Sequence, residues 1–137
     1  MNRVLGIALV VLALGIAIVP HYTDCQSQGN VSTLANGRAV PMKCHWAGVA
    51  EAGVAAPLAV VGVVAAVNRR KSNLLGMGVL GVVLGALAIG FPTAIIGVCP
   101  NPAHICATTM KPALLSMGSL AAAASLGLMA VAARSRQ

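Results

Sequence analysis

The sequence predicts an all-α protein, an integral membrane four-helix bundle with a small disulfide-stapled extracytoplasmic cap. Three observations lead to this prediction. Of the 137 residues, 58% are hydrophobic and 8% are charged, whereas about a quarter of the residues in an ordinary soluble domain are charged. The apolar residues gather in four continuous stretches, in which Glu51 is the only charged residue. Every cysteine lies between these stretches or at their edges.

Each stretch has close to the roughly 20 residues of helix that cross a hydrocarbon core of about 30 Å. The stretches do not alternate with polar residues, which favours helices over the strands of a barrel. A secretory signal peptide is the competing interpretation of the first stretch, but no small-x-small cleavage site follows it. The predicted spans of this single membrane domain, 1–137, are 4–19, 46–67, 74–98 and 112–133. They define two outer loops, 20–45 and 99–111, and one inner loop, 68–73.

The basic residues predict how the spans are oriented. Six cations lie at the termini and in the inner loop, among them Arg69, Arg70 and Lys71, and three lie on the opposite side. Because cytoplasmic loops are richer in Lys and Arg, we expect both termini in the cytoplasm and both outer loops outside it. Tyr22 and Trp46 flank the longer outer loop, where an aromatic belt is expected. The net charge of +7 is therefore a topology signal, and nucleic acid is not an expected partner.

Four cysteines, Cys25, Cys44, Cys99 and Cys106, lie in or beside the outer loops, and none lies in the inner loop. Extracytoplasmic space favours disulfides, and an even number of cysteines suits a disulfide framework. Pairing within each loop, Cys25 with Cys44 and Cys99 with Cys106, requires no assumption about the bundle. Pairing across the two loops stays open. We therefore expect structural disulfides in the cap.

A metal site is the alternative interpretation of the same region. Cys44 and His45, with Met42 and His21 nearby, offer soft ligands that suit copper(I) or zinc. Their spacing matches no standard zinc pattern, and the chain has no Cys-x-x-Cys pair for thiol exchange. We therefore expect no cofactor, with a bound metal as the alternative.

Glu51 is the only acidic residue within a predicted span, where a carboxylate costs several kcal/mol. It lies about five residues, or roughly 7–8 Å, below the start of its span. Cys44 precedes it by seven residues and shares its helix face, so Glu51 is expected to face inward beneath the cap. The simplest role is an interfacial ion pair or a hydrogen bond to a loop. A proton or cation site and a contact with another subunit are the alternatives.

The third span carries a packing motif for close approach between helices, formed by Gly81 and Gly85. Small residues also recur on the fourth span. We expect these faces to pack within the monomer by default, with a second copy of the chain as the alternative. Pro57 and Pro92 are expected to kink the second and third spans.

Several segments of the chain resemble a family of small bacterial membrane proteins, known as domain of unknown function 4418. The resemblance rests on Met42-Lys43-Cys44-His45-Trp46 followed by Glu51 and Gly53, on Val98-Cys99-Pro100, and on Cys106 ahead of Lys111-Pro112-Ala113. It implies four spans. The family pattern has a methionine before the last cysteine, where this chain has Ile105, and this difference argues against a metal role for the 99–111 loop.

The sequence predicts that the protein is not an enzyme, because it has no Ser-His-Asp constellation, P-loop, dinucleotide fingerprint or pair of carboxylates. The resemblance implies an accessory or assembly subunit of a transport complex in the bacterial cytoplasmic membrane. The implied partners are the lipid bilayer and an ABC-type permease, or another copy of the chain. The alternative functions are binding or transport of a soft metal (copper, zinc or iron) and proton-coupled export that uses Glu51.

Overall fold

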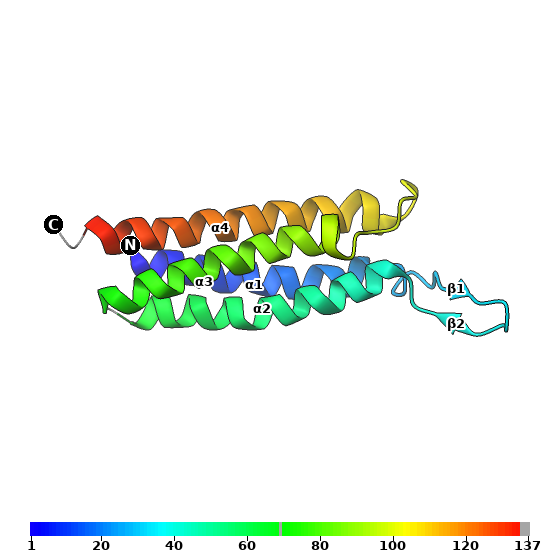
Figure 1. The fold of residues 1–137 in the computed structure, drawn as a ribbon, viewed down its shortest axis with the longest axis horizontal. Helices are drawn as coiled ribbons and strands as arrows, with labels where there is room; N and C mark the ends of the chain where they lie inside the picture. The colour runs from blue at the N-terminus through cyan, green and yellow to red at the C-terminus, as the bar shows by residue number, and fades with distance from the viewer. Residues whose placement is uncertain (69, 135–137) are drawn as a thin grey trace.

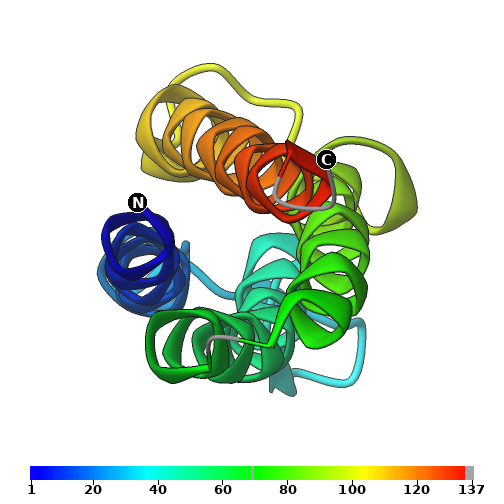
Figure 2. The same cartoon turned by 90° about the vertical axis from the view of Figure 1, so that its left-hand side faces the viewer.

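Four long helices dominate the structure, a computed structural model that describes residues 1–68 and 70–134. Each helix is long and apolar enough to cross a membrane. The chain is therefore a multi-pass membrane protein, and the prediction of an all-α four-helix bundle is confirmed (Figures 1 and 2). The four helices are α1 (Asn2–Thr23), α2 (Lys43–Val67), α3 (Lys71–Gly90) and α4 (Lys111–Arg134).

The helices pack most closely as two hairpins, α1 against α2 and α3 against α4. Within the first hairpin, a Cβ added at Gly6 would lie 2.6 Å from the carbonyl oxygen of Gly62. Within the second, a Cβ added at Gly85 would lie 2.9 Å from the backbone nitrogen of Ala122, and one added at Gly81 would meet Ser125. The faces of Gly81 and Gly85 are thus covered by α4 of the same chain.

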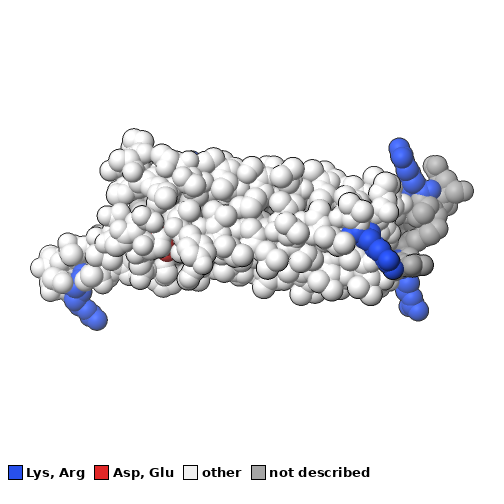
Figure 3. Space-filling model, turned by 180° about the vertical axis from the view of Figure 1, so that it is seen from behind, with Lys and Arg blue, Asp and Glu red and all other residues white. Residues whose placement is uncertain are grey.

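Large apolar side chains face outward along the bundle. Val11, Val60, Val83 and Leu120 are each at least half exposed. A bundle in water carries polar residues on its outer surface, so these side chains imply contact with lipid. In the face shown in Figure 3, Lys and Arg lie at the two ends of the molecule, and the long side between them carries none.

Both ends of the chain lie at one end of the bundle, and the segments that carry the cysteines lie at the other (Figure 1). Arg3, Arg70 and Arg134 belong to the end with the termini, whereas Arg69 lies outside the described residues. At the opposite end, the loop between α1 and α2 forms an antiparallel hairpin that projects beyond the bundle. Its strands are β1 (Ser32–Thr33) and β2 (Ala39–Val40).

The helices end at different residues from the predicted spans. α1 continues to Thr23, and α3 passes into a π-helix, η1 (Phe91–Ile95). The change follows from Pro92, which has no N–H to continue the regular hydrogen bonding. A second π-helix, η2 (Cys106–Met110), leads directly into α4. Cys106 therefore begins a helix and does not lie in an open loop. The sequence does not predict this, because an apolar stretch marks the lipid-facing part of a helix and not its ends.

Candidate metal centre at the cysteine end of the bundle

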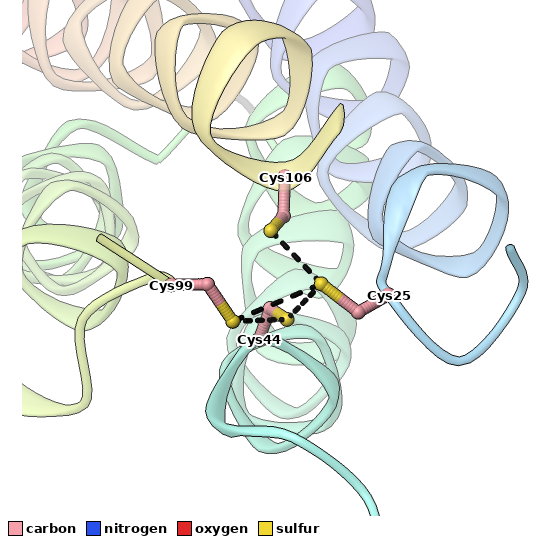
Figure 4. Close-up of side chains that lie close together, drawn as sticks. All are labelled: Cys25, Cys44, Cys99 and Cys106. Atoms are coloured by element: carbon pink, nitrogen blue, oxygen red, sulfur yellow. Dashed lines mark hydrogen bonds between the residues drawn. The ribbon is translucent and has the colours of Figure 1, made fainter. Parts of the chain in front are cut away.

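Four segments that are distant in the sequence each bring one cysteine to the same point (Figure 4). Cys25 follows the end of α1, and Cys44 lies in the first turn of α2. Cys99 follows η1, and Cys106 begins η2. Each helical hairpin thus contributes two thiols, one after its first helix and one at the start of its second helix.

The four Sγ atoms of this cysteine cluster all lie within 4.8 Å of one another. The Sγ of Cys25 is 2.7 Å from that of Cys44 and 3.1 Å from that of Cys106. The Sγ of Cys99 is 3.2 Å from that of Cys44. Cys25, Cys44 and Cys106 are at most 1% exposed, whereas Cys99 is partly exposed.

This arrangement corrects the expectation of a disulfide-stapled cap. All four cysteines, each within the described part of the chain, are free. The closest pair, Cys25 and Cys44, is 2.7 Å apart, and a disulfide bond is about 2.05 Å long. Cys25 also lies close to Cys106 of the other loop, whereas pairing within loops predicts that each cysteine lies close only to the cysteine of its own loop. Spacing within one loop contains no information on how two loops meet.

Four thiols around one point are the donor set of a tetrahedral metal site. With metal–sulfur bonds of about 2.3 Å, the sulfurs of such a site lie roughly 3.8 Å apart. The separations in the cluster, none above 4.8 Å, fit one ion after small shifts of the side chains. They leave no room for the inorganic core of an iron–sulfur cluster between the thiols.

Helix dipoles act on two of the four thiols. Cys44 and Cys106 lie at the start of α2 and of the helix that η2 and α4 form, where the dipole stabilises a thiolate. Burial raises the pKa of Cys25, and its contacts with Cys44 and Cys106 raise it further. Burial also raises the pKa of Cys99, to about 11. The cluster without metal therefore holds protons that a bound ion would displace.

A hydrogen bond between two side chains links the two arms of the first hairpin beside the cluster. His45 Nδ1 lies 2.9 Å from the Oδ2 atom of Asp24, and the backbone N–H of Ser27 donates to Asp24 Oδ1 over 2.7 Å. Burial alone would raise the pKa of Asp24, but the hydrogen bonds from His45 and Ser27 outweigh it and lower that pKa. Because Asp24 precedes Cys25 and His45 follows Cys44, the pair fixes these two thiols relative to each other.

The predicted metal ligands are only partly gathered at the cluster. Cys44 belongs to it, and Met42 Sδ lies 3.9 Å from Cys99 Sγ. His45 contacts Asp24 and not the thiols, and His21 lines a neighbouring pocket of about 120 Å³ together with Asp24 and His45.

Both cysteines of the 99–111 loop are members of the cluster. Ile105, in place of the family's methionine, therefore does not keep this loop away from the candidate metal site.

The aromatic residues expected at the interface, Tyr22 and Trp46, are 69% and 56% exposed beside the cysteine end of the bundle.

Glu51 lies deeper in the bundle than the cluster, on the same face of α2 as Cys44. Seven residues of helix separate the two, which corresponds to about 10 Å along the axis. Glu51 is fully buried, and neither carboxylate oxygen has a hydrogen-bond partner among the described residues. The ion pair or loop hydrogen bond expected for Glu51 is thus not formed, because its side chain lies in the apolar core below the loops.

Sequence reasoning missed two features of the site, the convergence of both cysteine pairs and the contact between Asp24 and His45. A signal for the first was available. Each pair brackets the connection between two antiparallel spans, so that all four thiols must lie at the same end of the bundle. No signal pointed to the Asp24–His45 contact, because its geometry depends on how α1 ends.

The fold and the site together define a multi-pass membrane protein with four convergent thiols at one end of its helix bundle. Residues 4–131 match the family described as domain of unknown function (DUF4418). The chain belongs to this family, which confirms the resemblance seen in its sequence. No curated protein and no solved structure matches the chain. The family description assigns no activity, and the cysteine cluster is the feature that indicates a function.

Proposed function

We propose that this protein binds one thiophilic metal ion through the four thiols of the cysteine cluster. The observation that carries the proposal is the meeting of four sulfur atoms, from four separate segments, within 4.8 Å. Burial of three of them provides the water-poor surroundings in which metal–thiolate bonds are strong. No enzymatic reaction is part of this proposal.

The residues around the cluster have distinct roles in the proposed site. Cys25, Cys44, Cys99 and Cys106 are the ligands, and the bound ion supplies the bonds that hold them together. Because each hairpin contributes two ligands, an ion would link α1 and α2 to α3 and α4 at this end of the bundle. The Asp24–His45 pair is a positioning element, since it joins the segments that carry Cys25 and Cys44.

The side of the membrane on which the proposed site lies follows from the orientation that the basic residues predict. The positive-inside rule predicts that both termini are cytoplasmic. The cluster lies at the opposite end of the bundle, so we propose that it faces the extracytoplasmic side and captures metal there.

Thiol oxidation is the competing role for four adjacent cysteines, and one experiment separates it from metal binding. The protein is purified in mild detergent under anaerobic, reducing conditions, and its metal content and number of free thiols are measured. Metal binding predicts about one ion per chain and four thiols that resist alkylation until a chelator removes the ion. A variant with all four cysteines replaced by serine is the control and should bind no metal.

Two results would overturn the proposal. One is a reduced protein that has four reactive thiols and takes up no thiophilic ion. The other is a protein that carries two disulfides when it is isolated from membranes with its thiols blocked at lysis. The accessory role beside an ABC-type permease and proton-coupled export through Glu51 stay predictions. The first is tested by co-purification of a permease and the second by the effect of Glu51→Gln on transport.

A further inference from the structure

Met42 approaches the thiol of the cluster that reaches the surface. Its Sδ atom lies 3.9 Å from the Sγ of Cys99, which is partly exposed, whereas the other three thiols are buried. Met42 immediately precedes α2, and its carbonyl oxygen accepts a hydrogen bond of 3.0 Å from the backbone N–H of His45. The thioether is thus held beside the exposed side of the cluster.

Among the described residues, the His, Cys, Asp and Glu side chains that converge closely enough to hold a metal are the four cysteines alone. The carboxylate of Asp24 is hydrogen-bonded to His45 and to Ser27. Glu51 lies about two helical turns below Cys44. The donor atoms that meet at the cluster are therefore sulfur atoms, four from cysteines and a fifth from Met42 beside them.

Four cysteines alone would bind either zinc or copper(I), and the fifth sulfur atom favours one of these two metals. Zinc in proteins is bound by thiolate, imidazole and carboxylate groups. A thioether is a neutral, soft ligand that suits copper(I). A methionine beside the exposed thiol therefore contributes nothing to the capture of zinc but provides a first contact for a soft monovalent ion.

We propose that the ion taken up by the cysteine cluster is copper(I), and that Met42 is its first ligand and delivers it to Cys99. This inference rests on the metal-binding function proposed above. The ion first binds the sulfur atoms of Met42 and Cys99. The thiolates of Cys44 and Cys25, which lie 3.2 and 3.8 Å from Cys99, then replace the thioether. Cys106, 3.1 Å from Cys25, completes the four-thiol site. Each thiol that bonds to copper releases its proton to water, and copper stays in the +1 state throughout.

The test compares Met42→Leu with a matched control, Met117→Leu, in the intact, reduced protein in detergent. Leucine preserves most of the volume of methionine but removes its sulfur. Met117 packs against Gly15 of α1, part-way along the bundle, and so reports the general effect of losing a thioether. Copper(I) is supplied as a coloured chelator complex, and the rate of its transfer to the protein is followed by absorbance. Zinc(II) affinity is measured by competition with a second chromogenic chelator.

Met42→Leu is expected to slow copper(I) transfer by about tenfold, in the range seen when supporting groups of metal sites are removed. It should leave zinc(II) affinity unchanged, which also shows that the four-thiol site is still folded. Met117→Leu should change neither quantity. In the wild-type protein, copper(I) should displace zinc(II).

Two outcomes would overturn this inference alone. Copper(I) could enter Met42→Leu at the wild-type rate, or the wild-type protein could retain zinc(II) in the presence of copper(I). Both leave the proposed metal function intact. A wild-type protein that binds neither ion overturns the proposed function and this inference together.

Discussion

The cysteine cluster and Glu51 are two buried polar features of the molecule, joined by the α2 face that carries both Cys44 and Glu51, and they differ in their partners. Each thiol of the cluster lies close to other thiols, whereas neither oxygen of Glu51 has a partner among the described residues. A buried polar group without a partner is costly, most of all in a membrane protein. The convergence of several donors indicates a ligand, whereas a single unpaired carboxyl group does not by itself indicate one.

The number of donor groups and the number of segments they come from indicate a binding site better than burial does. Glu51 is fully buried, as are three of the cysteines to within 1%. Only the cysteines arrive from four segments and share one point. The sequence singles out Glu51 for its charge and the four cysteines for their place beside the outer loops, but only the structure shows that the thiols meet.

The largest expected effect is stabilisation of the bundle by metal. A ligand that binds only the folded state at 100 times its dissociation constant adds about 2.7 kcal/mol to the free energy of unfolding. Because the cluster joins both hairpins, this gain should appear for the whole bundle when unfolding is followed by circular dichroism in detergent. The double variant Cys44→Ser/Cys106→Ser should show no gain. An equal gain in that variant would mean that metal binds elsewhere.

A change at Glu51 is expected to act in the opposite sense to a change in the cluster. Replacing an unpaired buried carboxyl group by an apolar side chain removes its desolvation cost, so Glu51→Met should stabilise the protein by about 1–3 kcal/mol. Glu51→Gln is the matched control and should stabilise less, since its amide is also left unpaired. The measurement is chemical unfolding in detergent. If Glu51→Met is less stable than wild type, the carboxyl group of Glu51 has a partner such as a buried water, and the contrast with the cluster fails.

The Asp24–His45 pair is expected to have a smaller effect, confined to metal affinity. Asp24→Asn weakens the hydrogen bond that holds the segments of Cys25 and Cys44 together, so affinity should fall by about tenfold. His104→Ala is the control, because His104 belongs to the second loop and not to this pair. Affinity is measured by chelator competition. An unchanged affinity in Asp24→Asn would show that the cluster does not need this pair.

The fold could be predicted from the sequence because lipid imposes a simple rule, a long apolar stretch for each helix. The ends of the helices could not, because residues such as Cys106 and Thr23 extend helices beyond the apolar stretches.

The cysteines could be assigned to one end of the bundle from the sequence, but not to one another. Their pairing depends on the angle at which the two hairpins meet, and no local pattern encodes that angle. Glu51 could be placed on the inner face of its helix from its seven-residue distance to Cys44. Its lack of a hydrogen-bond partner among the described residues depends on how the four helices pack, which no pattern within α2 encodes.

X-ray absorption spectroscopy of the reduced, metal-loaded protein decides whether the four cysteines bind the ion, because it reports the atoms bonded to the ion. With zinc as the probe, four thiolate ligands predict a single shell of four sulfur atoms at about 2.3 Å. A shell dominated by nitrogen or oxygen atoms near 2.0–2.2 Å would contradict a four-cysteine site, whatever the affinity of the protein for metal.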